Sequence, residues 1–390
     1  MPKPSVGAVP ALDDLIRPGM RIAVADGTGT PRALFPELTR IAGHHGDLRL
    51  VLGWTPHAEP DLDGAAFADA RTVMSGWGLR KPVDAGAVRS VPTRLSAVPS
   101  LLAGPLRPDL VLASLVRTPD GLRFGAEVSW MRGAVLAGIP VAAVVSRTAP
   151  HSDAGPPLPA DAITVLGETD DAPREVAFSA PGEVDRRIAA HVARWVPEGA
   201  RVQVGPGRLG AAVLDAIDVP VRVDSGLLPE SVVDLDARGL LISAFGAYMV
   251  GTRRLYDWAD GRALLHPLEV THDPGRLCSD TPSPLIAVNT AVEIDRAGQV
   301  NVEGTATAVV GGVGGHPDYA AAGTRSLRGL SVVAVASGHR GASTLVETLS
   351  RPVTTASHDV DVVVTEHGSA DLRGLDRRER AAALARLWDE

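Results

Sequence analysis

Three glycine-rich segments are the first stretches whose composition suggests chemistry. They read DGTGTP at 26–31, VGPGRLG at 204–210 and VVGGVGGHPDY at 309–319. Closely spaced glycines let backbone N–H groups approach an anion, and the N-terminus of a following helix favours negative charge. None of the segments has the Lys-Ser/Thr pair of a P-loop, and none is a convincing dinucleotide fingerprint. Contact with a phosphate-bearing ligand is one reading of the first two segments, and tight turns are the other.

The third segment is the strongest of these candidates. Its four glycines surround a single valine, a composition that suits neither helix nor strand, and a histidine and an aspartate follow. A structural Ω-type loop is the alternative reading. The candidate ligand-binding residues from the last two segments are Gly205, Gly207, Gly311, Gly312, Gly314, Gly315, His316 and Asp318.

A second polar cluster follows a buried strand near the end of the chain. The stretch VDVVVTEHG at 360–368 places Glu366 and His367 at the carboxyl end of that strand. Open α/β sheets present functional groups at this edge, which makes Glu366 a binding candidate. A structural ion pair between Glu366 and Arg373 is an equally weighted alternative.

Other catalytic arrangements are poorly represented. Glu269 and His272 have a metal-ligand spacing, but two ligands are too few, and no metal is expected. A serine nucleophile elbow is absent from the sequence. The single cysteine, Cys278, lies in no recognisable Cys–His arrangement, and we expect it to be structural.

An internal repeat indicates the elements that position these residues. GMRIAVADG at 19–27 and GARVQVGPG at 199–207 share four residues at a constant offset of 180, and a helical pattern follows each copy. Each copy therefore predicts a strand, a glycine turn and a helix. We expect two structurally related lobes, one formed by residues 1–183 and the other by residues 184–390.

The remaining apolar runs predict an α/β fold. Short buried strands alternate with helical stretches, which favours mostly parallel sheets with helices on both faces. The expected strands lie at 48–54, 108–116, 139–145, 219–226, 330–337 and 360–368, with a hairpin within 283–304 and a last helix at 377–388.

Composition narrows the class of protein. The chain has 390 residues, 45% of them hydrophobic, and a net charge of −8, which argues against broad nucleic-acid or anionic-membrane binding. One cysteine excludes an intrachain disulfide and fits a reducing compartment. The N-terminus lacks a signal pattern, and the best apolar run, 133–145, is too short to span a bilayer. We expect a cytoplasmic protein without a membrane segment.

Several segments together resemble the acetyl-CoA hydrolase/transferase family, which includes acetate, succinyl and 4-hydroxybutyrate CoA-transferases. These are NTAVEIDRAGQVN, VVGGVGGHPDY and TEHGSADLRGL in the second half, LIRPGMRIAVADGTGTP near the start, and RVQVGPGRLGAAVLDAI and GTRRLYDW between them. The resemblance covers nearly the whole chain. It implies two similar CoA-transferase-type lobes related by duplication, an active cleft between them, and a homodimer.

The resemblance also implies a chemistry. In the family a glutamate attacks an acyl-CoA and forms a mixed anhydride. The CoA thiolate then returns to give a glutamyl-CoA thioester and release the first carboxylate, and an incoming carboxylate reverses these steps and takes up the CoA. Backbone amides of the glycine loop stabilise the oxyanion. Acyl-CoA and a small carboxylate are therefore the expected partners, with coenzyme A thioester as substrate and no permanently bound cofactor.

The sequence departs from the family at the nucleophile. Alignment of VDSGLLPESVVDL at 223–235 with the family's glutamate motif places Gly226 at the catalytic position. Glycine cannot form the acyl or thioester adduct. Asp224, two residues earlier on the same strand face, or Glu230 beyond a turn is a possible displaced nucleophile.

A second route uses water instead of a side chain. Water would fill the volume vacated at Gly226, with His272 or His316 as general base, which would make a thioester hydrolase. His272 replaces a family asparagine, and His316 stands where glutamine is common; a purely structural role for each is the alternative. We therefore expect a CoA-transferase or acyl-CoA hydrolase for short-chain acyl-CoA that forms no glutamyl-CoA, or else a non-catalytic acyl-CoA-binding homologue.

Overall fold

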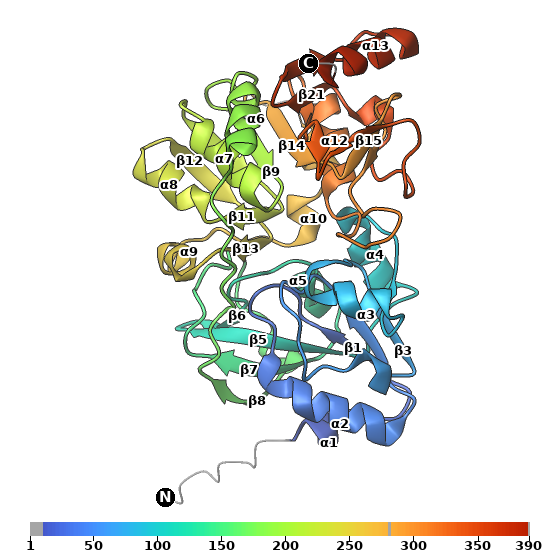
Figure 1. The fold of residues 1–390 in the computed structure, drawn as a ribbon. Helices are drawn as coiled ribbons and strands as arrows, with labels where there is room; N and C mark the ends of the chain where they lie inside the picture. Colours follow the sequence, from blue (N-terminus) through green and yellow to red (C-terminus); the bar gives the residue numbers. More distant parts are fainter. Residues whose placement is uncertain (1–10, 280–281, 389–390) are drawn as a thin grey trace, which may run out of the picture.

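The computed structural model describes residues 11–279 and 282–388 of the chain. It contains two lobes, drawn in blue to dark green and in light green to red in Figure 1, each built on a sheet with helices packed on it. This confirms the predicted α/β class.

The first lobe contains an eight-stranded sheet. Its neighbouring strands are parallel except for the short β6, which is antiparallel to β5. Every residue of Val141–Ser146 is buried, as expected for a strand covered on both faces. Across the sheet, the strands are β4 (Arg89–Ser90), β3 (Asp69–Thr72), β2 (Arg49–Leu52), β1 (Arg21–Val24), β5 (Leu110–Thr118), β7 (Val141–Ser146) and β8 (Ile163–Thr169), with β6 (Gly121–Arg123) on β5.

The second lobe contains a seven-stranded sheet, again parallel except for its last strand. In its centre Val202 lies opposite Ile286, and Val204 lies opposite Val288. The strand order is β12 (Leu241–Phe245), β10 (Val221–Asp224), β9 (Arg201–Val204), β14 (Leu285–Thr290), β17 (Leu330–Ala334), β21 (Val362–Thr365) and β22 (Gly368–Asp371).

The two sheets share one topology. If the two-residue edge strand β4 is left aside and the remaining parallel strands of each main sheet are numbered along the chain, both sheets read 3-2-1-4-5-6, with β1 and β9 as the first strands. This correspondence supports the predicted internal duplication, which the repeat between residues 19–27 and 199–207 suggests. In both sheets the strand order reverses between the strands numbered one and four. Sheets of this kind bind ligands at that point.

Helices cover the sheets, and further short strands pair within the second lobe. The helices are α1 (Leu12–Leu15), α2 (Phe35–His45), α3 (Arg80–Asp84), α4 (Val98–Ala103), α5 (Met131–Leu136), α6 (Glu183–Ala193), α7 (Arg208–Ala216), α8 (Ser231–Ala237), α9 (Arg253–Ala259), α10 (Leu268–Thr271), α11 (Pro274–Leu277), α12 (His316–Arg325) and α13 (Arg377–Trp388). The small strands are β11 (Leu227–Pro229) with β13 (Tyr248–Val250), β15 (Glu293–Asp295) with β16 (Val300–Asn301) and β20 (Leu345–Val346), and β18 (Gly338–His339) with β19 (Ala342–Ser343).

The lobes are joined by a continuous hydrophobic core. Bridges connect Glu127 to Tyr248 and Asp153 to Leu265. One buried cluster includes Val128 of the first lobe and Met249 of the second. The boundary expected between residues 183 and 184 falls just after the first residue of α6, a helix that packs on α7. The boundary itself stays a prediction. In residues 11–279 and 282–388, no helix has both the length and the apolar character needed to cross a bilayer.

Most predicted elements correspond to observed ones. The expected strands at 48–54, 108–116 and 139–145 are β2, β5 and β7, and the last helix is α13. The segment 283–304 differs in part. Its first strand, β14, joins the main sheet, because its neighbours β9 and β17 pair with it on both sides. The hairpin is confined to β15 and β16, around Gly298.

Candidate active site

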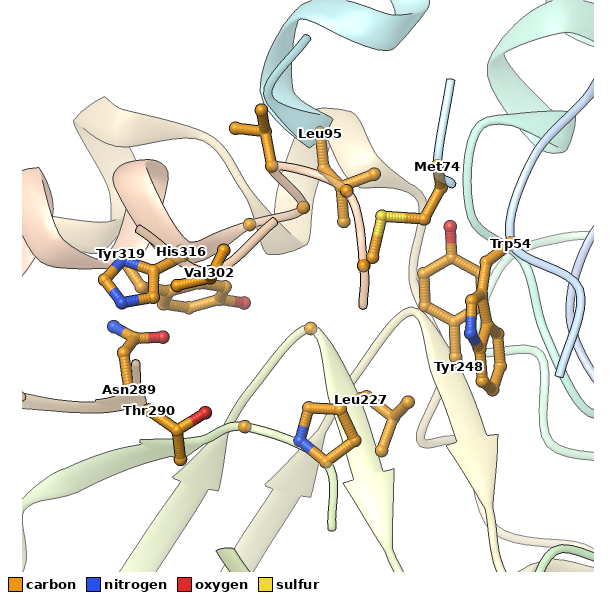
Figure 2. Close-up of a pocket in the computed structure, with 18 of the residues that line it drawn as sticks. Trp54, Met74, Leu95, Leu227, Tyr248, Asn289, Thr290, Val302, His316 and Tyr319 are labelled. Carbon is orange, nitrogen blue, oxygen red and sulfur yellow. The ribbon is translucent and has the colours of Figure 1, made fainter. Parts of the chain in front are cut away.

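A cavity of about 470 Å³ lies between the lobes and brings together many of the predicted residues. Most of its wall comes from the second lobe: residues at the carboxyl ends of β9, β10 and β14, the loop before α12, and side chains such as His316 and Tyr319 (Figure 2). Of the predicted residues, those that line it are Gly205, Gly226, His272, Gly311, Gly312, Gly314, Gly315 and His316.

The glycine-rich loop of residues 311–315 forms one side of the cavity and docks on the first lobe. Leu95 N donates to Gly314 O at 3.0 Å, and the Ser75 hydroxyl donates to Gly311 O at 3.1 Å. Gly76 pairs with Gly311, and a Cβ placed on Gly76 would lie 2.6 Å from Gly311 Cα. The close approach of the two lobes therefore depends on the absence of side chains at this contact.

Gly226 and His272 lie next to each other in the cavity wall. A Cβ placed on Gly226 would lie 2.8 Å from His272 Nε2, and one placed on Gly315 would lie 2.6 Å from the same atom. The imidazole therefore occupies the space into which a side chain at position 226 would extend. In this part of the site, the His272 ring fills the space left by the missing side chains of Gly226 and Gly315.

His272 is held as a neutral ring. Its side chain is buried, its Nδ1 lies 2.9 Å from Thr271 Oγ1, and its ring meets Tyr319 edge-on at 5.1 Å. The Tyr319 hydroxyl donates to Thr271 O at 2.9 Å, which fixes both rings. Burial, aided by the nearby Arg276, lowers the pKa of His272 to about 3. The ring is uncharged at neutral pH and presents Nε2 beside Gly226.

One end of the cavity is polar. It is formed by Gln203, Asn289, Thr290 and His316, and we call it the polar end (Figure 2). Gln203 Nε2 donates to Asn289 Oδ1 at 3.2 Å. Within the described residues, the buried atoms Gln203 Oε1, Asn289 Nδ2 and His316 Nε2 have no hydrogen-bond partner. Buried polar groups are nearly always paired, so these three atoms indicate a place for a polar ligand.

His316 resembles His272 in its electrostatics. Its Nδ1 lies 2.6 Å from Thr355 Oγ1, and burial lowers its pKa to about 4 although the Thr290 backbone opposes the shift. It is therefore neutral at physiological pH.

The opposite end of the cavity is apolar. It is formed by Trp54, Met74, Trp77, Leu227 and Tyr248, and we call it the apolar end. Figure 2 shows Trp54, Met74 and Tyr248 grouped on the side away from Asn289 and His316. The cavity thus has two chemically different halves, with Gly226 and the 311–315 loop between them.

Several predicted residues lie outside this cavity. Asp224 is buried and held by both guanidinium nitrogens of Arg276 at 2.9 Å, with Arg201 at 3.5 Å. The Glu230 carboxylate accepts from Thr252 N and Oγ1. Neither carboxylate lines the cavity.

The other predicted binding residues outside the cavity have structural partners. Asp318 accepts from Ser96 N and Oγ, which ties α12 to the first lobe. Glu366 accepts from Ser337 N and Oγ instead of pairing with Arg373. Gly207 is the N-cap of α7 and has φ +111°, a turn role.

The 26–31 segment encloses a buried carboxyl group of the same chain. The Glu127 carboxylate accepts from Thr28 N at 3.0 Å and Gly29 N at 3.1 Å. A Cβ on Gly27 or Gly29 would lie 2.5 or 2.6 Å from that carboxylate. The glycines are therefore needed for close approach to Glu127. Burial raises its pKa to about 8, with the nearby Asp26 adding to the shift.

The sequence interpretation missed residues that the fold contributes from other segments. Gln203 and Asn289 are the next-to-last residues of β9 and β14, so their position at the turning point of the sheet was a usable signal. Trp54 and Met74 come from loops of the first lobe and carry no local motif. Within the described residues, no group of three or more His, Cys, Asp or Glu side chains could hold a metal ion.

Comparisons with known proteins agree with this geometry. Residues 251–389 match the acetyl-CoA hydrolase/transferase C-terminal domain. The chain is 27% identical to a succinyl-CoA:acetate/propanoyl-CoA:succinate CoA transferase of Fasciola hepatica, covering 95% of this chain and 82% of that protein. It is 29% identical to an acetyl-CoA hydrolase of Saccharomyces cerevisiae, over 52% of this chain and 42% of that protein.

A solved structure shares the fold. The crystal structure of RipA from Yersinia pestis superposes with a TM-score of 0.84 at 22% identity, covering 95% of this chain and 91% of RipA. Curated relatives of this chain include both CoA-transferases and acetyl-CoA hydrolases. Residues 251–389 therefore match the acetyl-CoA hydrolase/transferase C-terminal domain, and nearly the whole chain is similar to a CoA-transferase enzyme.

Proposed function

We propose that this protein hydrolyses an acyl-CoA thioester in the inter-lobe cleft without a covalent protein intermediate. The observation that carries this proposal is the composition of the cavity wall. Among the described residues, none of those lining the cavity is an aspartate, glutamate or cysteine. The position that the family resemblance assigns to the nucleophile, Gly226, has no side chain, and His272 fills the adjoining volume.

Water is the nucleophile that this arrangement supports. The oxygen of water bonds to the thioester carbonyl carbon on the Gly226 side, and backbone amides of the 311–315 loop stabilise the oxyanion. The C–S bond then breaks. His272 Nε2 accepts the proton from the water and returns it to the departing CoA thiolate, giving a carboxylic acid and free CoA. A ring with a pKa of about 3 is a weak base, so turnover is expected to be slow.

A second candidate function is binding of acyl-CoA without turnover. One observation favours it: burial lowers the pKa of both His272 and His316 far below neutrality, to about 3 and about 4. Efficient general bases have pKa values near the working pH.

One incubation separates these functions. The pure protein is mixed with acetyl-CoA, with and without propionate as acceptor, and free thiol and propionyl-CoA are followed. Thiol release without propionate is the expected result. Propionyl-CoA formation that requires the acceptor would contradict hydrolysis and support transfer. If there is no turnover but CoA raises the melting temperature, binding alone is the function, and if CoA has no effect the cleft assignment fails.

A further inference from the structure

We infer that the apolar end is an acyl subsite that selects neutral, bulky apolar acyl groups, such as branched or aromatic ones, over carboxylate-bearing ones. This inference rests on the proposed function, since it assumes that an acyl-CoA occupies the cleft. It concerns which thioester is bound, and it does not depend on turnover.

The wall of the apolar end is aromatic. Trp54 meets Trp77 edge-on at 5.6 Å and Tyr248 edge-on at 5.5 Å. Aromatic residues make up only 4% of the chain, so three rings on one wall are a strong local concentration. Aromatic walls bind apolar groups through large contact area and defined edge and face positions. The shape and polarity of this end therefore suit a bulky hydrocarbon group.

A buried carboxyl group holds these rings in place. Asp26 Oδ2 accepts from the Tyr248 hydroxyl at 2.9 Å and from Trp54 N at 3.2 Å. The Tyr248 hydroxyl also lies 2.5 Å from Ser129 Oγ. Tyr248 thus uses its hydroxyl within the first lobe and contributes its ring to the cavity. The wall is fixed in position and presents apolar surface.

The scarcity of charged residues in the cavity wall disfavours acyl groups whose far end carries a carboxylate. Among the described residues that line the cavity, Arg80 is the only aspartate, glutamate, lysine or arginine. Its side chain is exposed, and its Nη2 donates to Val310 O at 3.4 Å. A carboxylate buried beside Trp54 would have only this exposed guanidinium, already bonded to Val310 O, to offset its charge, and a poorly paired buried charge is strongly unfavourable. Acyl groups that end in a carboxylate should therefore bind weakly.

The polar end fixes the direction of the ligand. The pantetheine arm of coenzyme A carries two amides, each with one donor and one acceptor. Gln203 and Asn289 bond to each other and leave one acceptor and one donor open, and His316 Nε2 is open as well. Amides of the ligand satisfy such groups, whereas a hydrocarbon leaves them unpaired. The arm therefore lies at the polar end, and the acyl group lies at the apolar end.

Three stable thioethers test the inference without turnover. Affinities of the full-length protein are measured by calorimetry for S-ethyl-CoA, S-(2-phenylethyl)-CoA and S-(3-carboxypropyl)-CoA. We expect the phenylethyl compound to bind at least about tenfold more tightly than the carboxypropyl compound, which corresponds to ~1.4 kcal/mol. Equal or reversed affinities would overturn the inference while leaving acyl-CoA binding intact. Absence of binding by all three would instead contradict the proposed function.

Substitutions at the apolar end test whether its side chains cause the preference for apolar acyl groups. Trp54→Ala should weaken phenylethyl binding about 30-fold, the scale of a buried aromatic anchor, and change S-ethyl-CoA binding little. Trp258→Ala is the matched control, because Trp258 stacks on Arg262 and donates to Asp236 away from the cavity. Met74→Lys, which places a cation in the apolar end, should reverse the preference towards the carboxypropyl compound. Retention of the wild-type preference in both Trp54→Ala and Met74→Lys would refute the subsite.

Discussion

At the scale of single residues, the site depends on how Gly226 and His272 share one small space. Position 226 is a glycine, and His272 extends into the space beside it, 2.8 Å from the place of a Cβ. Each residue accounts for the other: a larger side chain at 226 would collide with the imidazole. We therefore propose that the glycine at the expected nucleophile position and the histidine beside it are one coupled structural change.

This pairing predicts that restoring the carboxylate requires two substitutions. Gly226→Glu alone should lower the free energy of unfolding by about 1–3 kcal/mol, because it overpacks the space filled by His272. Gly226→Glu combined with His272→Asn should recover stability and form a glutamyl-CoA adduct with acetyl-CoA. Thermal melting and intact-protein mass spectrometry measure the two effects. His272→Asn alone is the control and should give no adduct; an adduct in that control, or none in the double variant, would contradict the pairing.

Glu127 predicts a pH dependence of stability. Its pKa is raised to about 8 in the folded protein, against an ordinary value of 4.5. The folded state therefore holds a proton that the unfolded state has lost, and this contribution to stability is present at low pH and disappears as pH rises towards 8. Glu127→Gln should remove this loss of stability with rising pH. The free energy of unfolding of the wild type, relative to that of the variant, should therefore fall by roughly 1.4 kcal/mol per pH unit between pH 5.5 and 7.5.

Denaturant unfolding at several pH values measures this difference. The amide can keep the hydrogen bonds from Thr28 N and Gly29 N, so the variant should remain folded. Asp26, whose pKa burial raises to about 6, titrates in both proteins, and comparison with Glu127→Gln separates the Glu127 contribution. Parallel pH profiles for the two proteins would show that Glu127 is ionised in the folded state.

At the scale of elements, the central feature is the docking of the 311–315 loop on the first lobe. Gly76 has φ +99°, and a side chain there would meet Gly311 Cα. Gly76→Ala should therefore displace the loop and weaken S-ethyl-CoA binding about tenfold, equivalent to ~1.4 kcal/mol. Calorimetric titration gives the affinity directly.

The chain offers a matched control for this substitution. Gly46 ends α2 with φ +73°, and a Cβ placed on it would have no atom of the described residues within 4 Å. Gly46→Ala should therefore introduce comparable backbone strain, on the order of 1 kcal/mol, without touching the cleft. Equal affinities in the two variants would mean that the loop contact does not shape the ligand site.

The elements themselves were largely predictable from the sequence, because alternating apolar strands and helix patterns are local signals. The strand–glycine–helix repeat located β1 and β9, and the motifs located Gly226, His272 and the 311–315 loop. The role of the 26–31 loop was not predictable, because Glu127 reaches it from another part of the chain. The apolar end was missed for the same reason, since Trp54 and Tyr248 are far apart in sequence.

At the scale of the whole molecule, two lobes whose sheets share a strand order apart from the edge strand β4 contribute residues to one cleft. The second sheet contributes the polar end from β9 and β14, and loops of the first lobe contribute much of the apolar end. In the proposed function, the two lobes therefore divide the recognition of the acyl-CoA between them. This division explains why neither half of the sequence alone indicated the acyl subsite.

The most direct test of the central claim is the fate of the oxygen atom from water. The protein is incubated with acetyl-CoA in ¹⁸O-labelled water without an acceptor, and both the released acetate and the intact protein are analysed by mass spectrometry. We predict acetate carrying one ¹⁸O from the solvent and a protein that carries neither an acyl group nor CoA, even when the reaction is quenched during turnover. A protein-bound CoA thioester would show that a side chain of this chain still performs the attack.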